Sequence, residues 1–148
     1  MVRPITAAET RPLRAAVLRP GQPPEALVYA GDEHPQALHV GAFEDERLVG
    51  IATVYPEPPP EAYRDAMPGG GAFRLRGMAT VPEVRGGGHG RELLEACFAH
   101  ARAHGARVLW CNARVGALGF YRRMGLETIG PEFDIAGIGP HYVMWREV

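Results

Sequence analysis

Hydrophobic positions along this chain fall into short runs with two different spacings. The apolar runs 37–43 and 48–55 flank a polar tetrapeptide, Glu44-Asp45-Glu46-Arg47, and this arrangement predicts a β-hairpin. Residues 2–5 and 73–81 are expected to form further strands. Beyond them, apolar residues recur at the three- and four-residue spacing of one helical face: Leu93, Leu94, Cys97, Phe98 and Ala101.

Capping and breaking residues mark the first helix and the longest loop. Thr6 and Glu9 have the spacing of a capping box, so a helix is expected to begin there and run toward Leu18. Pro12 lies early in that helix and destabilises it unless the turn is distorted. The stretch 56–71 is rich in Pro and Gly, which predicts a surface loop around a short helix.

The second half of the chain alternates helices with strands. The central helix is expected to end at a Gly105 C-cap, before an apolar strand over 107–112. A helix over 115–124 precedes two final strands at 126–129 and 141–146. This order of elements predicts a mixed α/β domain around one central sheet.

The composition is that of an ordinary globular chain. The 148 residues are expected to form a single domain, 1–148, with enough chain to bury a core. A net charge of −1 argues against a nucleic-acid or membrane partner. No apolar run reaches the roughly 18 residues of a spanning helix, and the N-terminus does not resemble a secretory signal, so a cytoplasmic location is expected.

Cysteine, histidine and lysine usage excludes several chemistries. Cys97 lies on the apolar helix face and Cys111 within an apolar strand, so both are expected to be small buried hydrophobes. His100 and His104 have the spacing of a helical metal pair, but the glutamate that accompanies such histidines in zinc proteases is missing, and no metal site is predicted. The chain has no lysine, so it cannot acetylate itself on a lysine side chain.

A glycine-rich loop between the strand ending near Val81 and the central helix carries the clearest chemical signal. The first turn of a helix has about four backbone N–H groups without internal partners. Most helices cap them with Ser, Thr, Asp or Asn, but here the candidate positions are glycines, which supply no oxygen. Arg85 and Arg91 add positive charge to the same helix end. The arrangement predicts an anion site that suits a phosphate or pyrophosphate.

Spacing separates the phosphate-binding motifs that this loop could represent. A nucleotide P-loop requires a lysine, which the chain lacks. In a dinucleotide fingerprint the last glycine would fall on Arg91 or Leu93. The remaining pattern, Arg-x-x-Gly-x-Gly over 85–90, resembles the coenzyme A pyrophosphate loop of the GNAT superfamily of N-acetyltransferases. The alternative is a glycine-rich β–α turn without a ligand.

A second motif supports the same resemblance. Asn112, followed by Ala117-Leu118-Gly119-Phe120-Tyr121 and Gly125-Leu126, resembles the superfamily pattern N-x-x-[A]-x-x-[FL]-Y-x-x-x-G-[FL]. The resemblance implies a GNAT-like acyl-CoA N-acyltransferase fold of mixed α/β (α+β) type. Its central sheet is mostly antiparallel, with flanking helices and one parallel strand pair, 73–81 and 107–112, that splays apart.

The resemblance also implies where the coenzyme lies. The splay leaves backbone groups of strand 73–81 unpaired, and the pantetheine arm would bond them as an additional strand. The pyrophosphate would rest on the amides of the glycine loop, and Asn112 would be a polar anchor in the same cleft. The predicted coenzyme-binding residues are Met78, Ala79, Thr80, Arg85, Gly86, Gly87, Gly88, His89, Gly90, Arg91 and Asn112.

Two side chains are predicted to be catalytic. Tyr121 matches the family position of the general acid, and a phenol stays protonated at neutral pH yet can protonate a leaving thiolate. The alternative role for Tyr121 is aromatic packing. For the general base, His141 is the first candidate, followed by Glu132 and Asp134 in the preceding loop. The alternative for these three is a surface or loop contact.

The sequence therefore predicts an acetyl-CoA-dependent N-acetyltransferase that transfers the acetyl group directly to a primary amine, without a metal. The absence of a Cys–His nucleophile pair favours direct attack over a covalent enzyme intermediate. The alternative is a non-catalytic acyl-CoA-binding or sensor module. A homodimer is the usual expectation for the superfamily.

The acceptor is not identified by the sequence. Its walls are expected from residues 19–35, 56–72 and 130–142. Arg74 and Arg76 share one face of a strand, where they would meet an acidic acceptor or form a solvated face. Acidic residues could instead attract a cationic amine, or be solvated loop residues: Asp32, Glu33, Glu57 and Glu61.

Overall fold

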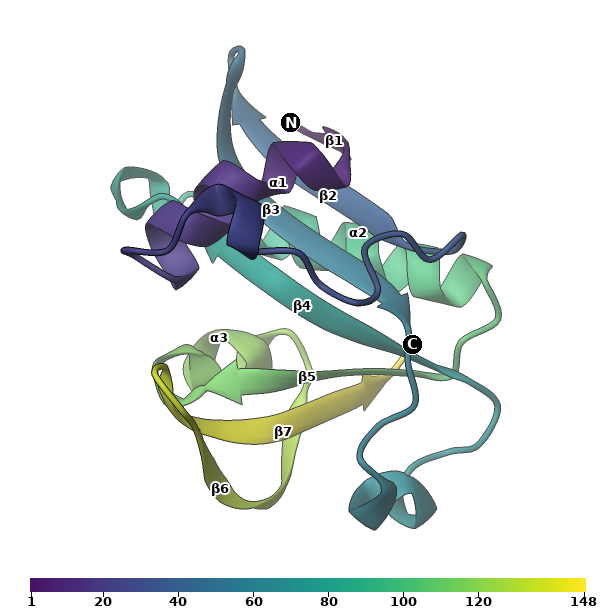
Figure 1. Ribbon diagram of the computed structural model, residues 1–148. Helices are drawn as coiled ribbons and strands as arrows, with labels where there is room; N and C mark the ends of the chain where they lie inside the picture. The colour runs from purple at the N-terminus through teal and green to yellow at the C-terminus, as the bar shows by residue number, and fades with distance from the viewer.

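The computed structural model describes residues 1–148, which fold around one seven-stranded sheet in the order β1-β2-β3-β4-β5-β7-β6 (Figure 1). The strands are β1 (Val2–Pro4), β2 (Leu38–Glu44), β3 (Arg47–Pro56), β4 (Ala72–Thr80), β5 (Val108–Arg114), β6 (Glu127–Ile135) and β7 (Gly139–Glu147). The helices are α1 (Ala7–Leu13), α2 (His89–Ala103) and α3 (Leu118–Arg123), with a π-helical turn η1 (Arg14–Leu18). Short 3₁₀ turns are η2 (Pro24–Ala26), η3 (Glu61–Ala66), η4 (Pro82–Val84) and η5 (Val115–Ala117).

All neighbouring strands pair antiparallel except β4 and β5, which are parallel. The parallel ladder has three residue pairs, Ala72–Val108, Phe73–Leu109 and Arg74–Trp110, after which the two strands are no longer paired. The predicted mixed α/β fold, with a mostly antiparallel sheet and one splayed parallel pair, is confirmed.

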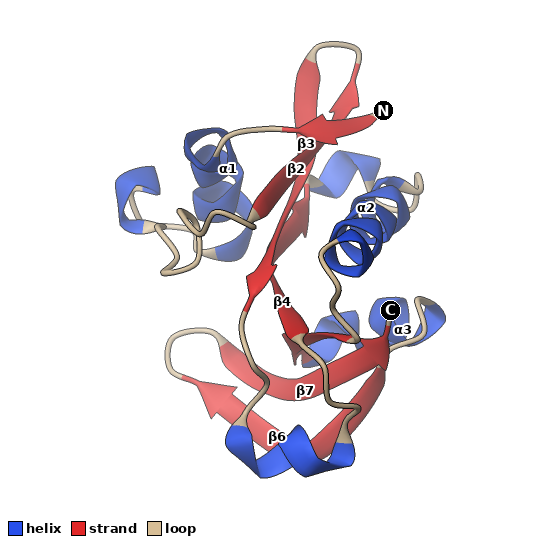
Figure 2. Cartoon of the chain, turned by 90° about the vertical axis from the view of Figure 1, so that its right-hand side faces the viewer, coloured by secondary structure: helices blue, strands red, loops and turns tan.

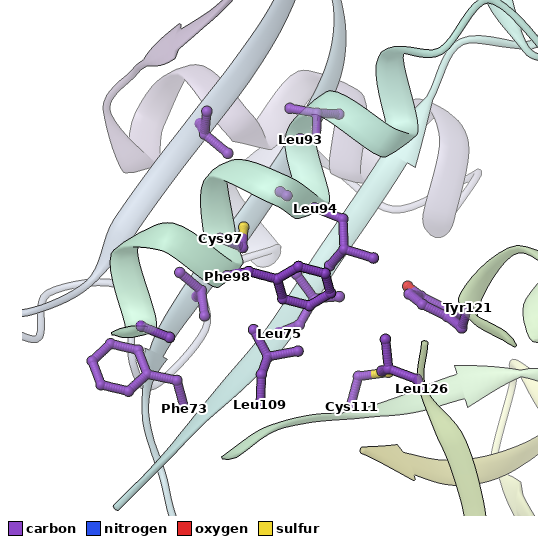
Figure 3. Close-up of a cluster of buried hydrophobic side chains, with 14 of the residues drawn as sticks. Phe73, Leu75, Leu93, Leu94, Cys97, Phe98, Leu109, Cys111, Tyr121 and Leu126 are labelled. Carbon is purple, nitrogen blue, oxygen red and sulfur yellow. The ribbon is translucent and has the colours of Figure 1, made fainter. Parts of the chain in front are cut away.

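The helices cover the two faces of the sheet unequally. Seen along the sheet edge, α1 and η1 lie against one face, and α2 and α3 lie against the other (Figure 2). The apolar stripe predicted for α2 faces inward, since Leu93, Leu94, Cys97, Phe98 and Ala101 are all buried. They pack in one cluster with Leu75, Leu109, Cys111 and other strand residues (Figure 3). This core fixes the distance between α2 and the splayed strands.

The first helix begins and ends as its residues dictate. Thr6 and Glu9 form the predicted capping box, with the Glu9 amide donating to Thr6 Oγ1 and the Thr6 amide donating to Glu9 Oε1. Pro12 lies inside α1, and the helix continues as the π-helical η1 directly afterwards. The turn that follows Pro12 is therefore distorted, as expected for a proline that destabilises the regular helix. Such π-helical turns are frequent at functional sites.

The C-terminal strands differ from the prediction. The strand expected at 126–129 continues to Ile135, with a register shift between Ile129 and Phe133, where Gly130 takes a left-handed φ of 76°. Glu132 and Asp134 therefore lie in β6 and not in a loop, because the bulge lets the strand resume pairing with β7 after Gly130.

None of the helices has both the length and the apolar character that a membrane-spanning helix needs.

Candidate active site

Strand β4 presents an unpaired edge where β5 turns away. The β3–β4 register shifts between Ile51 and Thr53, and Gly77 on β4 takes a left-handed φ of 65°. Beyond Arg74, the opposite edge of β4 has no strand beside it, which includes residues 78–80. Backbone N–H and C=O groups on that edge are available to a ligand that can bond as a strand.

The glycine loop leads from β4 to the first turn of α2. Gly88 is the N-cap residue of α2, has a left-handed φ of 88°, and provides no side-chain hydrogen bond. The first intrahelical bond runs from the Glu92 amide to the Gly88 carbonyl, so the amides that precede Glu92 in the turn lack intrahelical partners. A Cβ added at Gly86 or Gly88 would meet no atom within 4 Å. The loop therefore exposes main-chain donors beside open space.

These features border one cavity of about 1230 Å³. Nine of the predicted coenzyme-binding residues line it, together with Tyr121: Met78, Ala79, Thr80, Arg85, Gly86, Gly88, His89, Gly90 and Arg91. Gly87 is not a lining residue, because its amide is turned back to donate to the Val84 carbonyl at 3.1 Å. Asn112 and His141 do not line the cavity either.

The charge of the cavity is strongly positive. Its wall includes six arginines and a single carboxylate, Glu95, which pairs with Arg91 at 2.9 Å. The arginines come from the glycine loop, α2, α3, β5 and β7: Arg85, Arg91, Arg102, Arg114, Arg123 and Arg146. Sequence reasoning singled out only the first two. The spacing of Arg91, Glu95, Phe98 and Arg102 along α2 places them on one helical side and was an available signal.

His89 connects the glycine loop to the β2–β3 hairpin. Its Nε2 lies 3.1 Å from Glu44 Oε2, and its Nδ1 is buried without a hydrogen-bond partner. The side chain is 13 % exposed. His89 therefore fixes the start of α2 against the hairpin as well as lining the cavity.

Tyr121 extends from α3 toward α2 across the splay, and its hydroxyl end is directed at the buried cluster (Figure 3). It is 8 % exposed and lines the cavity. Burial, with smaller contributions from the thiols of Cys111 and Cys97, raises the pKa of Tyr121 well above its ordinary value of 10.0. The hydroxyl is therefore protonated at neutral pH, as a proton donor must be.

The two cysteines are buried, as predicted. Burial raises the pKa of the Cys97 thiol to about 12, and it raises the pKa of the Cys111 thiol to about 12 against a small opposing effect of Arg74. Neither thiol has the ionisation that a nucleophile needs at neutral pH.

His141 lies on the sheet face opposite Tyr121. The residue is 3 % exposed, its Nδ1 is 2.7 Å from the Gly139 carbonyl oxygen, and its ring centroid lies 5.8 Å from that of Phe133. It pairs in register with Arg114 of β5. Glu132 and Asp134 flank Phe133 on β6, so strand alternation directs them away from the His141 face.

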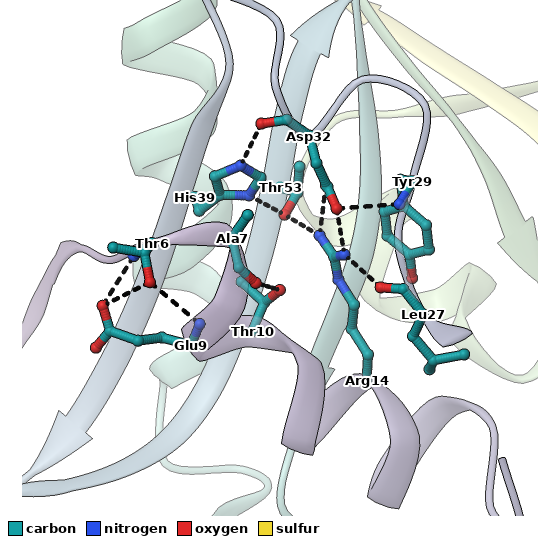
Figure 4. A network of polar contacts seen from close by, with 10 residues as sticks. All are labelled: Thr6, Ala7, Glu9, Thr10, Arg14, Leu27, Tyr29, Asp32, His39 and Thr53. Atoms are coloured by element: carbon teal, nitrogen blue, oxygen red, sulfur yellow. Dashed lines mark hydrogen bonds and ion pairs between the residues drawn. The ribbon is translucent and has the colours of Figure 1, made fainter. Parts of the chain in front are cut away.

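The segment that follows η1 is fixed by a buried arginine (Figure 4). Arg14 donates two hydrogen bonds to the carboxylate of Asp32, at 2.8 and 2.9 Å, and further bonds to the Leu27 carbonyl and Thr53 Oγ1. The Tyr29 amide also donates to Asp32. The suggestion that Asp32 attracts a cationic amine is wrong, because its charge is buried and already paired.

Arg74 and Arg76 are half-buried, so a solvated face does not describe them. Arg74 pairs with Glu57 at 3.0 Å, and its guanidinium lies 5.0 Å from the Trp110 ring centroid. The Arg76 guanidinium lies 4.1 Å from the centroid of Tyr29, which is stacked on its other side by Arg14 at 3.8 Å.

His100 and His104 stack on each other with ring centroids 4.2 Å apart, and both contact Phe73. No group of three or more His, Cys, Asp or Glu side chains is placed to hold a metal ion. The His pair is explained by aromatic packing at the end of α2.

The fold and the site together are those of an acetyltransferase. The chain belongs to the acetyltransferase (GNAT) family, whose model matches residues 6–126, and the prediction of an N-acetyltransferase is confirmed. Among curated proteins, the uncharacterized N-acetyltransferase YitI of Bacillus subtilis (strain 168) is 34% identical over 145 residues, covering 98% of this chain and 94% of that protein.

Solved structures share the fold at low sequence identity. Arabidopsis thaliana NAA60 in complex with acetyl-CoA superposes with a TM-score of 0.80 at 14% identity, covering 100% of this chain and 98% of that one. Escherichia coli ElaA gives 0.72 at 17% identity over 99% and 97%. An aminoglycoside 6'-N-acetyltransferase complexed with coenzyme A gives 0.68 at 14% identity over 99% and 96%.

Proposed function

We propose that this protein transfers an acetyl group from acetyl-CoA directly to a primary amine, in a single domain spanning residues 1–148. The observation that carries the proposal is the arginine-rich cavity of about 1230 Å³ that joins the glycine loop, the free edge of β4 and Tyr121. Two structural neighbours, NAA60 and the aminoglycoside acetyltransferase, were solved with acetyl-CoA or coenzyme A.

The residues of the cavity fit the coenzyme part by part. The amides at the start of α2, with Arg85 and Arg91, would hold the pyrophosphate, since a helix N-terminus and guanidinium groups both favour an anion. The open space beside Gly86 and Gly88 leaves room for that approach. The free edge of β4 at 78–80 would bond the amides of the pantetheine arm.

The chemistry follows from the thioester. The lone pair of a neutral amine forms a C–N bond to the acetyl carbonyl carbon, negative charge develops on the carbonyl oxygen, and N–H groups of β4 near Thr80 stabilise it. The C–S bond then breaks, and the leaving thiolate takes a proton from Tyr121. The proton lost by the nitrogen passes to a base and finally restores Tyr121 through solvent.

His141 is the side chain we propose as that base, acting through water because it does not line the coenzyme cavity. Its Nδ1 is engaged with the Gly139 carbonyl, which leaves Nε2 as the atom that would accept the proton. Glu132 and Asp134 are weaker candidates, because both are exposed on the opposite side of β6. A His141→Ala variant that retains the acidic limb of the pH–rate profile would exclude His141.

The cellular setting is also part of the proposal. The net charge of −1 favours a cytoplasmic protein without a nucleic-acid or membrane partner. A homodimer is proposed from the family resemblance. Analytical ultracentrifugation of the purified chain tests that assembly.

The decisive experiment compares acetyl-CoA with S-acetylpantetheine, which has the same thioester and arm but no phosphates. Calorimetry is expected to show binding of acetyl-CoA and at least a hundredfold weaker binding of S-acetylpantetheine. A thiol-release assay over a panel of amines is then expected to show turnover. Binding without turnover on any amine would support the acyl-CoA-binding module, and equal affinity for the two thioesters would overturn the assigned phosphate site.

A further inference from the structure

The sheet face covered by η1 carries a group of polar side chains where β4 and β5 separate. Arg76 of β4 points to this face, because it stacks on Tyr29 from the segment after η2. Continuing the parallel register two residues past the last pair, Arg74–Trp110, places Asn112 of β5 opposite Arg76. Side chains two residues apart on a strand share a face, so Arg76 and Asn112 stand on either side of the opening.

Arg76 carries a charge that no side chain neutralises. Its two neighbours, Arg14 and Arg74, each pair with a carboxylate at 2.8 and 3.0 Å. Arg76 forms no ion pair and is held only by stacking on Tyr29. A half-buried guanidinium that is stacked on an aromatic ring keeps its N–H groups oriented and free for a planar anion.

Asn112 lacks a hydrogen-bond donor, whereas Arg76 lacks an anionic partner. Its Oδ1 is buried and has no hydrogen-bond partner. Buried amide oxygens in folded proteins almost always accept a hydrogen bond, so this oxygen is suited to a ligand that brings an N–H donor. The opening between the strands thus combines one unsatisfied acceptor with one unneutralised cation.

Tyr29 closes the side of the opening. A Cβ placed on Gly77, at the bulge of β4, would lie 3.1 Å from Tyr29 Oη. The ring itself is fixed between Arg14 and Arg76. A ligand held here lies on the η1 face of β4, whereas Tyr121 approaches the splay from the α2 and α3 side. The amine would add to the thioester carbonyl from the η1 side, and Tyr121 would protonate the leaving sulfur from the α2 and α3 side.

We propose that the acceptor is an amine that also carries a carboxylate, with the carboxylate bound by Arg76 and an amine N–H donated to Asn112 Oδ1. This inference rests on the proposed acetyl transfer and specifies its substrate class. Of the two acceptor classes considered from the sequence, it favours an acidic acceptor bound by Arg76 over a cationic amine attracted by acidic loop residues. It also assigns Asn112 to the acceptor and not to the coenzyme arm.

The test uses matched series of amines that differ only in the carboxylate. Each series contains an amino acid, its carboxamide and the decarboxylated amine, with small, aromatic and acidic side chains represented. A charge-assisted hydrogen bond predicts kcat/KM about ten- to a hundredfold higher for the free acid within the preferred series. The difference is expected in the acceptor KM.

Arg76→Gln is expected to abolish this preference by lowering kcat/KM for the free acid toward that for the carboxamide, while the affinity for acetyl-CoA stays unchanged. Arg76→Lys keeps the charge without the planar fork and is expected to retain part of the preference. Arg107→Gln is the matched control, since Arg107 is exposed just before β5 at the end of the strand away from the opening.

Each other result overturns the inference. Equal kcat/KM for acids and carboxamides in the native enzyme overturns the carboxylate while leaving acetyl transfer intact. An equal loss for both compounds in Arg76→Gln assigns Arg76 a structural role. No transfer within any series counts against the acceptor class, and acetyl-CoA calorimetry then reports separately on the proposed function. If Arg76→Gln fails to fold, the native series decides alone.

Discussion

Arg14 and Asp32 form an ion pair in which both side chains are 0 % exposed and two hydrogen bonds join guanidinium to carboxylate. The pair connects the π-helical turn η1 to the segment that carries Tyr29. Breaking a buried pair by removing one partner leaves an uncompensated charge, and this is more destabilising than the pair itself is stabilising.

Asp32→Asn is therefore expected to lower the free energy of unfolding by about 3–5 kcal/mol, because it leaves the Arg14 charge buried without a counterion. Urea denaturation measures the change. Glu83→Gln is the control, since Glu83 pairs with Arg47 on the surface with both side chains more than half exposed, and such pairs contribute little. Equal losses in the two variants would contradict a special role for the buried pair.

The same pair predicts how stability depends on pH. Burial alone raises the pKa of the Asp32 carboxyl, but hydrogen bonds from Arg14 and the Tyr29 amide outweigh it and hold the pKa below 3.8. A carboxyl whose pKa is lowered by folding stabilises the protein above its unfolded pKa and loses that contribution as pH falls through its folded pKa. The contribution of Asp32 to the free energy of unfolding is expected to stay constant down to about pH 4 and to decrease at lower pH. The Asp32→Asn variant should show a flatter acid limb.

Tyr121→Phe is expected to lower kcat at least tenfold, because the leaving thiolate loses its proton donor while the ring still packs against the core. The dissociation constant of acetyl-CoA, measured by calorimetry, should stay close to native. Since burial raises the pKa of Tyr121, the native enzyme is also expected to lose no activity through its ionisation below pH 10. Unchanged turnover in the variant would assign Tyr121 to packing alone.

The buried thiols predict slow modification of the native protein. With each pKa raised to about 12, both thiols stay protonated at pH 8, and neither side chain is accessible. An aromatic disulfide reagent is expected to react with Cys97 and Cys111 only after denaturation. Rapid reaction of either thiol in the folded protein would show that the core opens on the time scale of the assay.

The sequence was most informative where local chemistry sets the structure. The glycines at 86–90 predicted an uncapped helix start, and the period of the apolar residues located α2 and its buried face. Tyr121 was predicted from the resemblance of residues 112–126 to the superfamily pattern, and the structure places it beside the glycine loop around one cavity.

Features that depend on distant partners could not be predicted in this way. Nothing local to Arg14 indicates a carboxylate 18 residues away or a hydroxyl on β3. Arg146 reaches the cavity from the last strand, and its Nη1 donates to the Met124 carbonyl after α3. The extension of β6 past Gly130 depends on pairing with β7, which apolar periodicity alone does not show.

Three residue pairs are all that join the β1–β4 half of the sheet to the β5–β7–β6 half. Because this ladder is so short, its hydrogen bonds hold the two halves together less than the shared core around α2 does. A coenzyme arm bonded along β4 would extend the junction. It would then stabilise the sheet as well as supply the acetyl group. Amide hydrogen exchange along β5 should therefore slow when acetyl-CoA is bound. The exchange rate would then report the fraction of the protein that is occupied by the coenzyme.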